Sequence, residues 1–235
     1  MRILLISNSG KPFLEHCKAW IFQFLGPARK VAFVTAAILY DEAAYYERAR
    51  EALEGPRPAG ADLELLHLRG DAHPLVTLEQ ADALFMGGGN TYALLKRLRQ
   101  ADLLEPTRAR VRAGMPYIGS SAGSNVAGPN ILTTNDWNVV GLTTFEALGL
   151  VPFNINPHYL ETDPAMAPGS ETRDERIREY HVVWKNPVLG IEEGTLVRVE
   201  EGVATVLGTR RAKVFRRDQE PRWYRAGDRL ELGPD

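Results

Sequence analysis

The sequence contains a single cysteine, Cys17, among its 235 residues. One thiol cannot form a disulfide within the chain, and the cysteine and histidines show no zinc-ligand spacing. We therefore expect no metal and no other cofactor, and we expect a protein of the reducing cytoplasm.

An excess of charge of either sign is also missing. Lys and Arg total 28 and Asp and Glu total 30, which gives a formal charge of −2. This balance provides no general attraction to nucleic acid or to anionic membranes. Basic residues gather around Trp223 and Tyr224, but acidic residues intervene there. The pattern favours a solvated hairpin face over a nucleic-acid site.

Long apolar runs are absent as well. The apolar stretch at residues 3–6 is too short for a signal peptide or a membrane span, and no other segment approaches ~18 apolar residues. We expect no membrane association. The composition that is present, with 44% hydrophobic and 25% charged residues, is that of an average globular protein. The length suits one large domain.

Short apolar runs alternate with amphipathic stretches through the first half of the chain. This alternation predicts an α/β fold with a doubly wound, mostly parallel sheet. Strands are expected at residues 3–7, 31–35, 63–68, 83–86, 117–120 and 188–192. After residue 195 alternating β-like runs take over. We therefore expect one domain over 1–235, with the catalytic α/β sheet over 1–194 and a β-rich appendage over 195–235.

A candidate nucleophile lies in Gly119-Ser120-Ser121-Ala122-Gly123, which matches G-x-S-x-G directly after a predicted strand. A sharp strand-to-helix turn exposes the serine hydroxyl in this context, and the glycines let substrate approach it. Ser121 is the expected nucleophile. The amide of Ala122, at the helix start, is expected to stabilise an oxyanion. The alternative is a chance match, at roughly one chain in twenty.

A second glycine cluster, Gly87-Gly88-Gly89-Asn90, follows the strand predicted at residues 83–86. It lacks the last glycine of G-x-G-x-x-G, and the chain has no G-x-x-x-x-G-K-[ST], so a nucleotide site is disfavoured. Instead, the amides of Gly88 and Gly89 are candidates to complete an oxyanion hole beside Ser121. A plain tight turn is the alternative.

A serine nucleophile needs a general base, and the chain has five histidines. His158 stands in a polar, proline-containing stretch, residues 154–159, which we interpret as a loop. Three of the other histidines lie in helix or strand patterns, and His73 in another loop is a weaker candidate. His158 is therefore the preferred base.

Two carboxylates compete to orient the base. Asp136 lies in a loop that follows Ser121 by fifteen positions. Glu193 ends the strand predicted at residues 188–192. A strand end positions a side chain more rigidly than an irregular loop, which favours Glu193, but both remain candidates.

Several segments together carry a family resemblance. They are Gly87-Gly88-Gly89-Asn90-Thr91, Gly119-Ser120-Ser121-Ala122-Gly123-Ser124-Asn125, Asn156-Pro157-His158-Tyr159, Glu171-Thr172-Arg173-Asp174-Glu175-Arg176-Ile177 and Gly190-Ile191-Glu192-Glu193-Gly194. Nearly end to end, the chain resembles peptidase E, the aspartyl dipeptidases of serine peptidase family S51, which are related to cyanophycinases and class I glutamine amidotransferase domains. The resemblance implies a flavodoxin-like sheet with a C-terminal β-hairpin, and it matches Ser121 and His158 to the nucleophile and the base. It leaves the choice between Asp136 and Glu193 open.

The resemblance also implies a function. It implies a homodimer that hydrolyses dipeptides with an N-terminal aspartate (Asp-X) through an acyl-enzyme on Ser121. The substrate β-carboxylate then needs a fixed cation, for which Arg173 or Arg176 is a candidate, the alternative for each being an exposed ion pair. The sequence departs from the family pattern at residues 168–170, which bears on fine substrate selection.

Three other interpretations stay open. A cyanophycinase-like enzyme would act on β-aspartyl-arginine, and a ligand-binding member of the same fold would keep the elbow without turnover. An ordinary α/β-hydrolase esterase has the triad order Ser, Asp or Glu, His. The order Ser121, His158, Glu193 argues against that esterase, whereas Asp136 as the acid would not discriminate.

Overall fold

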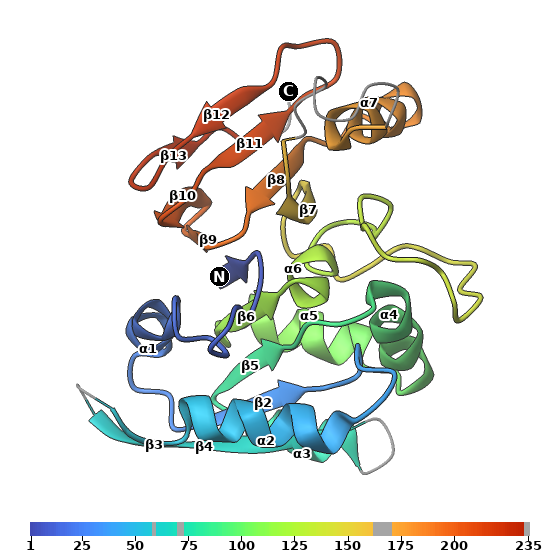
Figure 1. The fold of residues 1–235 in the computed structure, drawn as a ribbon. Helices are drawn as coiled ribbons and strands as arrows, with labels where there is room; N and C mark the ends of the chain where they lie inside the picture. The colour runs from blue at the N-terminus through green and yellow to red at the C-terminus, as the bar shows by residue number, and fades with distance from the viewer. Residues whose placement is uncertain (58–59, 70–72, 162–170, 233–235) are drawn as a thin grey trace.

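The computed structural model describes residues 1–57, 60–69, 73–161 and 171–232. Within these residues a nine-stranded sheet has the strand order β13-β10-β9-β1-β6-β5-β2-β4-β3 (Figure 1). Its strands are β1 (Arg2–Ile6), β2 (Lys30–Val34), β3 (Gly55–Arg57), β4 (Gly60–Leu68), β5 (Ala83–Met86), β6 (Tyr117–Ser120), β9 (Thr195–Glu200), β10 (Val203–Gly208) and β13 (Arg229–Leu230). The departure from the family pattern at residues 168–170 lies outside the described chain.

The five strands from β4 to β1 pair in parallel, as the alternating pattern predicts. Antiparallel strands extend both edges, with β3 beside β4 and with β9, β10 and β13 beyond β1. Parallel strands end at the same edge, so the segments after β1, β5 and β6 are brought together. The predicted α/β fold with a mostly parallel central sheet is confirmed.

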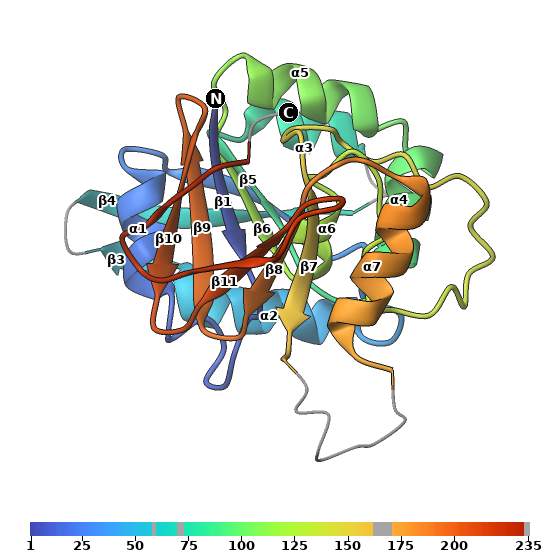
Figure 2. The same cartoon turned by 90° about the horizontal axis from the view of Figure 1, so that it is seen from above.

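Helices cover both faces of this sheet because its strands are apolar on both sides. Ile3 and Leu5 of β1 belong to the core under α3 (Pro74–Gln80), α4 (Thr91–Gln100) and α5 (Leu104–Arg112). Leu4 and Ile6 face the core under α1 (Lys18–Leu25) and α2 (Glu42–Leu53). Figure 2 shows α2 and α5 on opposite sides of the sheet.

A second sheet of the described chain has four strands in the order β12-β11-β8-β7. They are β7 (Asn154–Tyr159), β8 (Val188–Glu192), β11 (Ala212–Phe215) and β12 (Arg222–Tyr224). One face packs on the core through Ile155 and Leu189. Helix α7 (Arg173–Val183) covers the other face through Ile177 and Tyr180. The second sheet and α7 lie at the end of the molecule opposite β3 and β4 (Figure 1).

The strands are shared between the sheets differently from the predicted division at residue 194. β9 and β10 follow that residue but continue the central sheet beside β1. β7 and β8 precede it but pair with each other in the second sheet, where β11 joins β8. The expectation that residues 188–192 rejoin the central sheet is therefore wrong. An alternating pattern marks a strand but does not say which neighbour that strand pairs with.

No helix in the described part of the chain is long and apolar enough to cross a membrane.

Candidate active site

Ser121 lies in a sharp turn between β6 and the short helix α6 (Ala122–Asn125). Its backbone is in a left-handed conformation, with φ 52° and ψ −110°, which L-residues rarely adopt. The Ser121 amide donates to the Ile6 carbonyl at 2.9 Å and so ties the turn to β1. This backbone conformation presents the serine side chain at the end of the sheet, as the G-x-S-x-G pattern predicts.

The two glycines of the motif are required by close packing. A Cβ on Gly119 would collide with the Gly123 carbonyl, and a Cβ on Gly123 would collide with the Met86 carbonyl of β5. The buried Ser124 hydroxyl donates to the carbonyl of Ile6 at 2.8 Å and ties the turn to β1. Backbone atoms on every side therefore hold the nucleophile turn.

His158 approaches Ser121 from the second sheet. Its Nε2 lies 2.8 Å from the Ser121 hydroxyl oxygen. The residue belongs to β7 and not to a loop, which corrects the expectation for residues 154–159. The pairing of β7 with β8 shifts register between Pro157 and Tyr159, and His158 has a φ of 53°. A bulge of this kind redirects a side chain, and here the redirected ring contacts Ser121.

Glu193 completes a chain of contacts on the other side of the ring. Its Oε1 lies 2.8 Å from Nδ1 of His158. Because a carboxylate only accepts, this geometry suits the neutral ring that donates from Nδ1 to Glu193 and accepts at Nε2 from the hydroxyl of Ser121. The His158 and Glu193 side chains are 40% and 64% exposed, so the pair is open to solvent.

Asp136 is engaged elsewhere. Its Oδ2 accepts from the amide of Thr91 at 2.7 Å and from the hydroxyl of Thr91 at 2.6 Å, at the first turn of α4. The Thr134 hydroxyl lies 3.2 Å from the same oxygen. Both ring nitrogens of His158 already contact other residues. The structure therefore brings Glu193 and not Asp136 to His158, and Asp136 fixes the loop before Trp137 against α4.

The glycine segment after β5 borders the nucleophile. A Cβ on Gly88 would lie 3.1 Å from Cβ of Ser121, and Gly89 has a φ of 133°. The Gly88 amide already donates to the Tyr45 hydroxyl at 2.9 Å. Burial raises the pKa of Tyr45, so this hydroxyl stays protonated. The amides of Gly89 and Ala122 make no hydrogen bond within the described residues, which leaves these two available as donors.

The two arginines of α7 differ in their surroundings. Arg176 pairs with the exposed Glu171, with 2.9 Å between Nε and Oε2. Arg173 is half-buried, and burial followed by the charge of Arg176 lowers its pKa. Its guanidinium has no hydrogen bond or ion pair with any described residue. Thr172 and Glu175 form a capping box that fixes this first turn of the helix.

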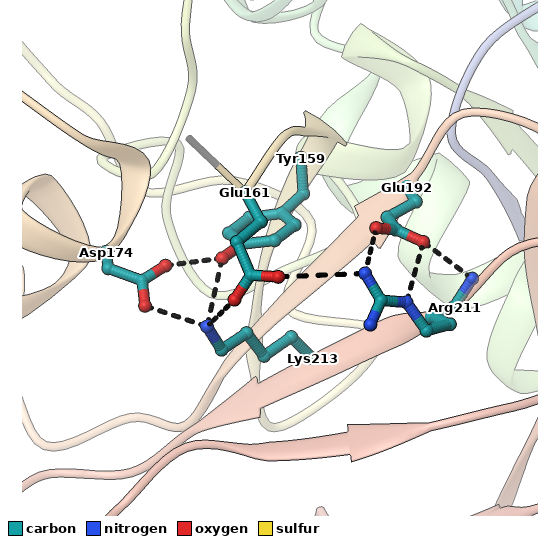
Figure 3. A network of polar contacts seen from close by, with 6 residues as sticks. All are labelled: Tyr159, Glu161, Asp174, Glu192, Arg211 and Lys213. Carbon is teal, nitrogen blue, oxygen red and sulfur yellow. Dashed lines mark hydrogen bonds and ion pairs between the residues drawn. The ribbon is translucent and has the colours of Figure 1, made fainter. Parts of the chain in front are cut away.

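A polar network around Lys213 and Arg211 of β11 was not predicted from the sequence (Figure 3). Lys213 of β11 is 7% exposed, and its Nζ lies 2.8 Å from Asp174 and 3.1 Å from Glu161. The Tyr159 hydroxyl donates to Asp174, and burial raises its pKa. Arg211 pairs with Glu192 at 2.9 Å. The network therefore contains Tyr159, Glu192 and Asp174, which are next in the sequence to His158, Glu193 and Arg173.

Ser7 and Tyr45 also contact the site's backbone and were not predicted. The available signal was weak. Ser7 is polar at the end of an otherwise apolar strand, and Lys213 alternates with apolar residues along β11. Neither pattern identifies a contact partner. Within the described residues no group of three or more His, Cys, Asp or Glu side chains is placed to hold a metal ion.

Comparison with known proteins places the chain in a family. The model of Peptidase family S51 matches residues 3–207. The chain is 45% identical over 233 residues to Peptidase E of Streptomyces coelicolor, covering 98% of this chain and 93% of that protein. It is 45% identical to a probable alpha-aspartyl dipeptidase of Drosophila melanogaster, covering 92% and 90%. A crystal structure of a putative peptidase E protein from Listeria monocytogenes shares the fold, with a TM-score of 0.68, 23% identity and coverage of 89% and 98%.

Proposed function

Because this chain belongs to peptidase family S51, we propose that it is a serine dipeptidase that hydrolyses dipeptides with an N-terminal aspartate. The contact chain from Ser121 through His158 to Glu193, with 2.8 Å at each step, is the observation that carries the proposal. Two hydrogen bonds of normal length in series are the arrangement that activates a serine hydroxyl.

The first half of the reaction forms an ester. Oγ of Ser121 attacks the carbonyl carbon of the substrate aspartate while Nε2 of His158 takes the hydroxyl proton. Glu193 stabilises the imidazolium that results. The carbonyl oxygen becomes an oxyanion, which the amides of Gly89 and Ala122 stabilise. When this intermediate collapses, the C–N bond breaks and His158 passes its proton to the leaving amine.

Water completes the cycle. His158 removes a proton from the water as it attacks the ester carbonyl. The ester bond then breaks, aspartate leaves, and the proton returns to Ser121. Gly88 does not contribute to the proposed oxyanion hole, although the sequence predicts that it does. Its amide donates to Tyr45 and holds the glycine segment in place.

Arg173 is the better candidate for the substrate β-carboxylate. Its half-buried guanidinium has no carboxylate partner among the described residues, whereas Arg176 is occupied by Glu171. A guanidinium binds a carboxylate through two parallel hydrogen bonds, and partial burial strengthens them. Binding of the β-carboxylate by Arg173 explains a preference for aspartate over uncharged residues at the N-terminus of the substrate.

We propose in addition a homodimer in the cytoplasm. The family resemblance supports the dimer, and the single cysteine fits a reducing compartment. Light scattering on the purified protein tests the dimer, and a monomeric mass at micromolar concentration would contradict it.

The activity is tested with purified protein and three substrates. We expect release of aspartate from Asp-Leu, no release of leucine from Ala-Leu and no cleavage of β-Asp-Arg. Ser121→Ala should abolish the Asp-Leu activity. The control is Ser120→Ala, because the Ser120 side chain is fully buried and its hydroxyl contacts Ser9. Hydrolysis that persists in Ser121→Ala would reject the proposed nucleophile.

A further inference from the structure

Three consecutive residues at the end of β1 accept hydrogen bonds from the backbone of the segments that carry Ser121, His158 and Glu193. The carbonyl of Ile6 accepts from the amide of Ser121 at 2.9 Å. The hydroxyl of Ser7 accepts from the amide of His158 at 2.9 Å. The side-chain oxygen of Asn8 accepts from the amide of Gly194, next to Glu193, at 3.0 Å.

Ser7 lies where the two sheets meet. Its side chain is fully buried. The hydroxyl donates to the carbonyl of Ile191 in β8 at 2.8 Å while it accepts from His158 in β7. Its amide donates to Thr195 of β9 at 3.1 Å. One side chain therefore bonds to both strands of the second sheet that lead into the site.

His158 needs this support because of its local backbone. The register shift between Pro157 and Tyr159 takes His158 out of the regular pairing of β7 with β8. A non-glycine residue with a φ of 53° keeps that conformation only where its surroundings enforce it. The Ser7 hydroxyl supplies the partner that the amide of a bulged residue lacks.

We propose that Ser7 is a positioning residue, which sets the distance between the nucleophile and the base by holding the His158 backbone to the same strand end that holds Ser121. The proposal rests on the function proposed above. Asn8 extends the same role to the turn that carries Glu193. In this arrangement the end of β1 holds the backbone of site residues from both sheets.

The test separates kcat from KM. Ser7→Ala removes the support of His158 but no group that touches substrate, so kcat for Asp-Leu should fall about 30-fold while KM changes less than about twofold, since small displacements of reacting groups cost up to ~10²-fold in rate. The control is Thr133→Val. The buried Thr133 hydroxyl also bonds to β7, but it donates to the carbonyl of Ile155 at 2.8 Å and not to His158. The kcat of Thr133→Val should stay within about threefold of the parent.

Each result decides between outcomes. Equal values of kcat for Ser7→Ala and Thr133→Val, with Ser121→Ala inactive, would overturn the positioning role and leave the proposed function intact. Activity in Ser121→Ala would reject the function itself. If Ser7→Ala does not fold, Asn8→Ala carries the test, because Asn8 is only partly buried. Its kcat should fall about fivefold with KM unchanged, and an unchanged kcat would overturn the proposal.

Discussion

The two sheets hold their parts of the site by different means. Ser121, on the central sheet, is enclosed by backbone atoms at distances that only glycine neighbours permit. His158 and Glu193, on the second sheet, are held by side-chain and amide hydrogen bonds and are 40% and 64% exposed. Ser121 is therefore fixed by steric packing, whereas the positions of His158 and Glu193 depend on polar contacts. The contrast predicts different responses to mutation.

The largest effect is expected in the nucleophile turn. Gly123→Ala places a Cβ against the carbonyl of Met86, and neither backbone segment can move without disrupting β5 or α6. We expect loss of activity beyond measurement and a loss of about 3 kcal/mol in the free energy of unfolding. The control is Gly141→Ala, whose added Cβ has no atom within 4 Å, so that only its φ of 63° opposes the change; we expect it to keep activity and to lose about 1 kcal/mol in the free energy of unfolding. A fully active Gly123→Ala would show that packing does not hold the turn.

A smaller effect is expected at α7, the helix that carries Arg173. Arg173→Met removes the cation proposed to bind the β-carboxylate, so KM for Asp-Leu should rise about 30- to 100-fold, with little change in kcat. Arg176→Met, which breaks only an exposed ion pair, should change KM less than about threefold. Steady-state kinetics on both variants decide the assignment. The reverse order of effects would assign recognition to Arg176.

The smallest effect is expected in the polar network around Lys213 of the second sheet. Lys213→Met leaves Asp174 and Glu161 without their shared cation. Both carboxylates keep some access to water, so we expect a loss of about 2 kcal/mol in the free energy of unfolding and a fall in kcat of only a few-fold. Lys30→Met, at an exposed pair with Glu64, should cost under about 0.5 kcal/mol. Urea denaturation measures both, and equal losses would contradict a structural role for the network.

The same contrast explains what the sequence could predict. The five central strands are apolar runs bounded by turns, and the nucleophile turn is encoded by adjacent small residues, so local patterns were sufficient for both. The strand β7 was predicted as a loop because it contains Asn154, Asn156 and Pro157. Its buried asparagines bond to residues between 130 and 135, and these contacts satisfy the polar side chains that made the segment resemble a loop.

The choice between the two acids also exceeded local information. Asp136 and Glu193 are both acidic, both near predicted site segments, and the sequence alone favoured Glu193 only on the rigidity of a strand end. The contact of Glu193 with His158 depends on how β8 pairs with β7. Asp136 finds its partners at Thr91, 45 residues away in the chain. Such partners are set by the fold, and the residues beside each acid in the sequence do not indicate them.

In the proposed mechanism the second sheet supplies both the base and the acid. The direct test compares kcat for Asp-Leu in Glu193→Gln and Asp136→Asn. Glu193→Gln keeps the shape but loses the charge that stabilises the imidazolium, so kcat should fall about 10³-fold. Asp136→Asn weakens a contact at the start of α4, at a cost of about 1 kcal/mol in stability and less than about tenfold in kcat. A 10³-fold loss in Asp136→Asn with near-parent activity in Glu193→Gln would contradict the account.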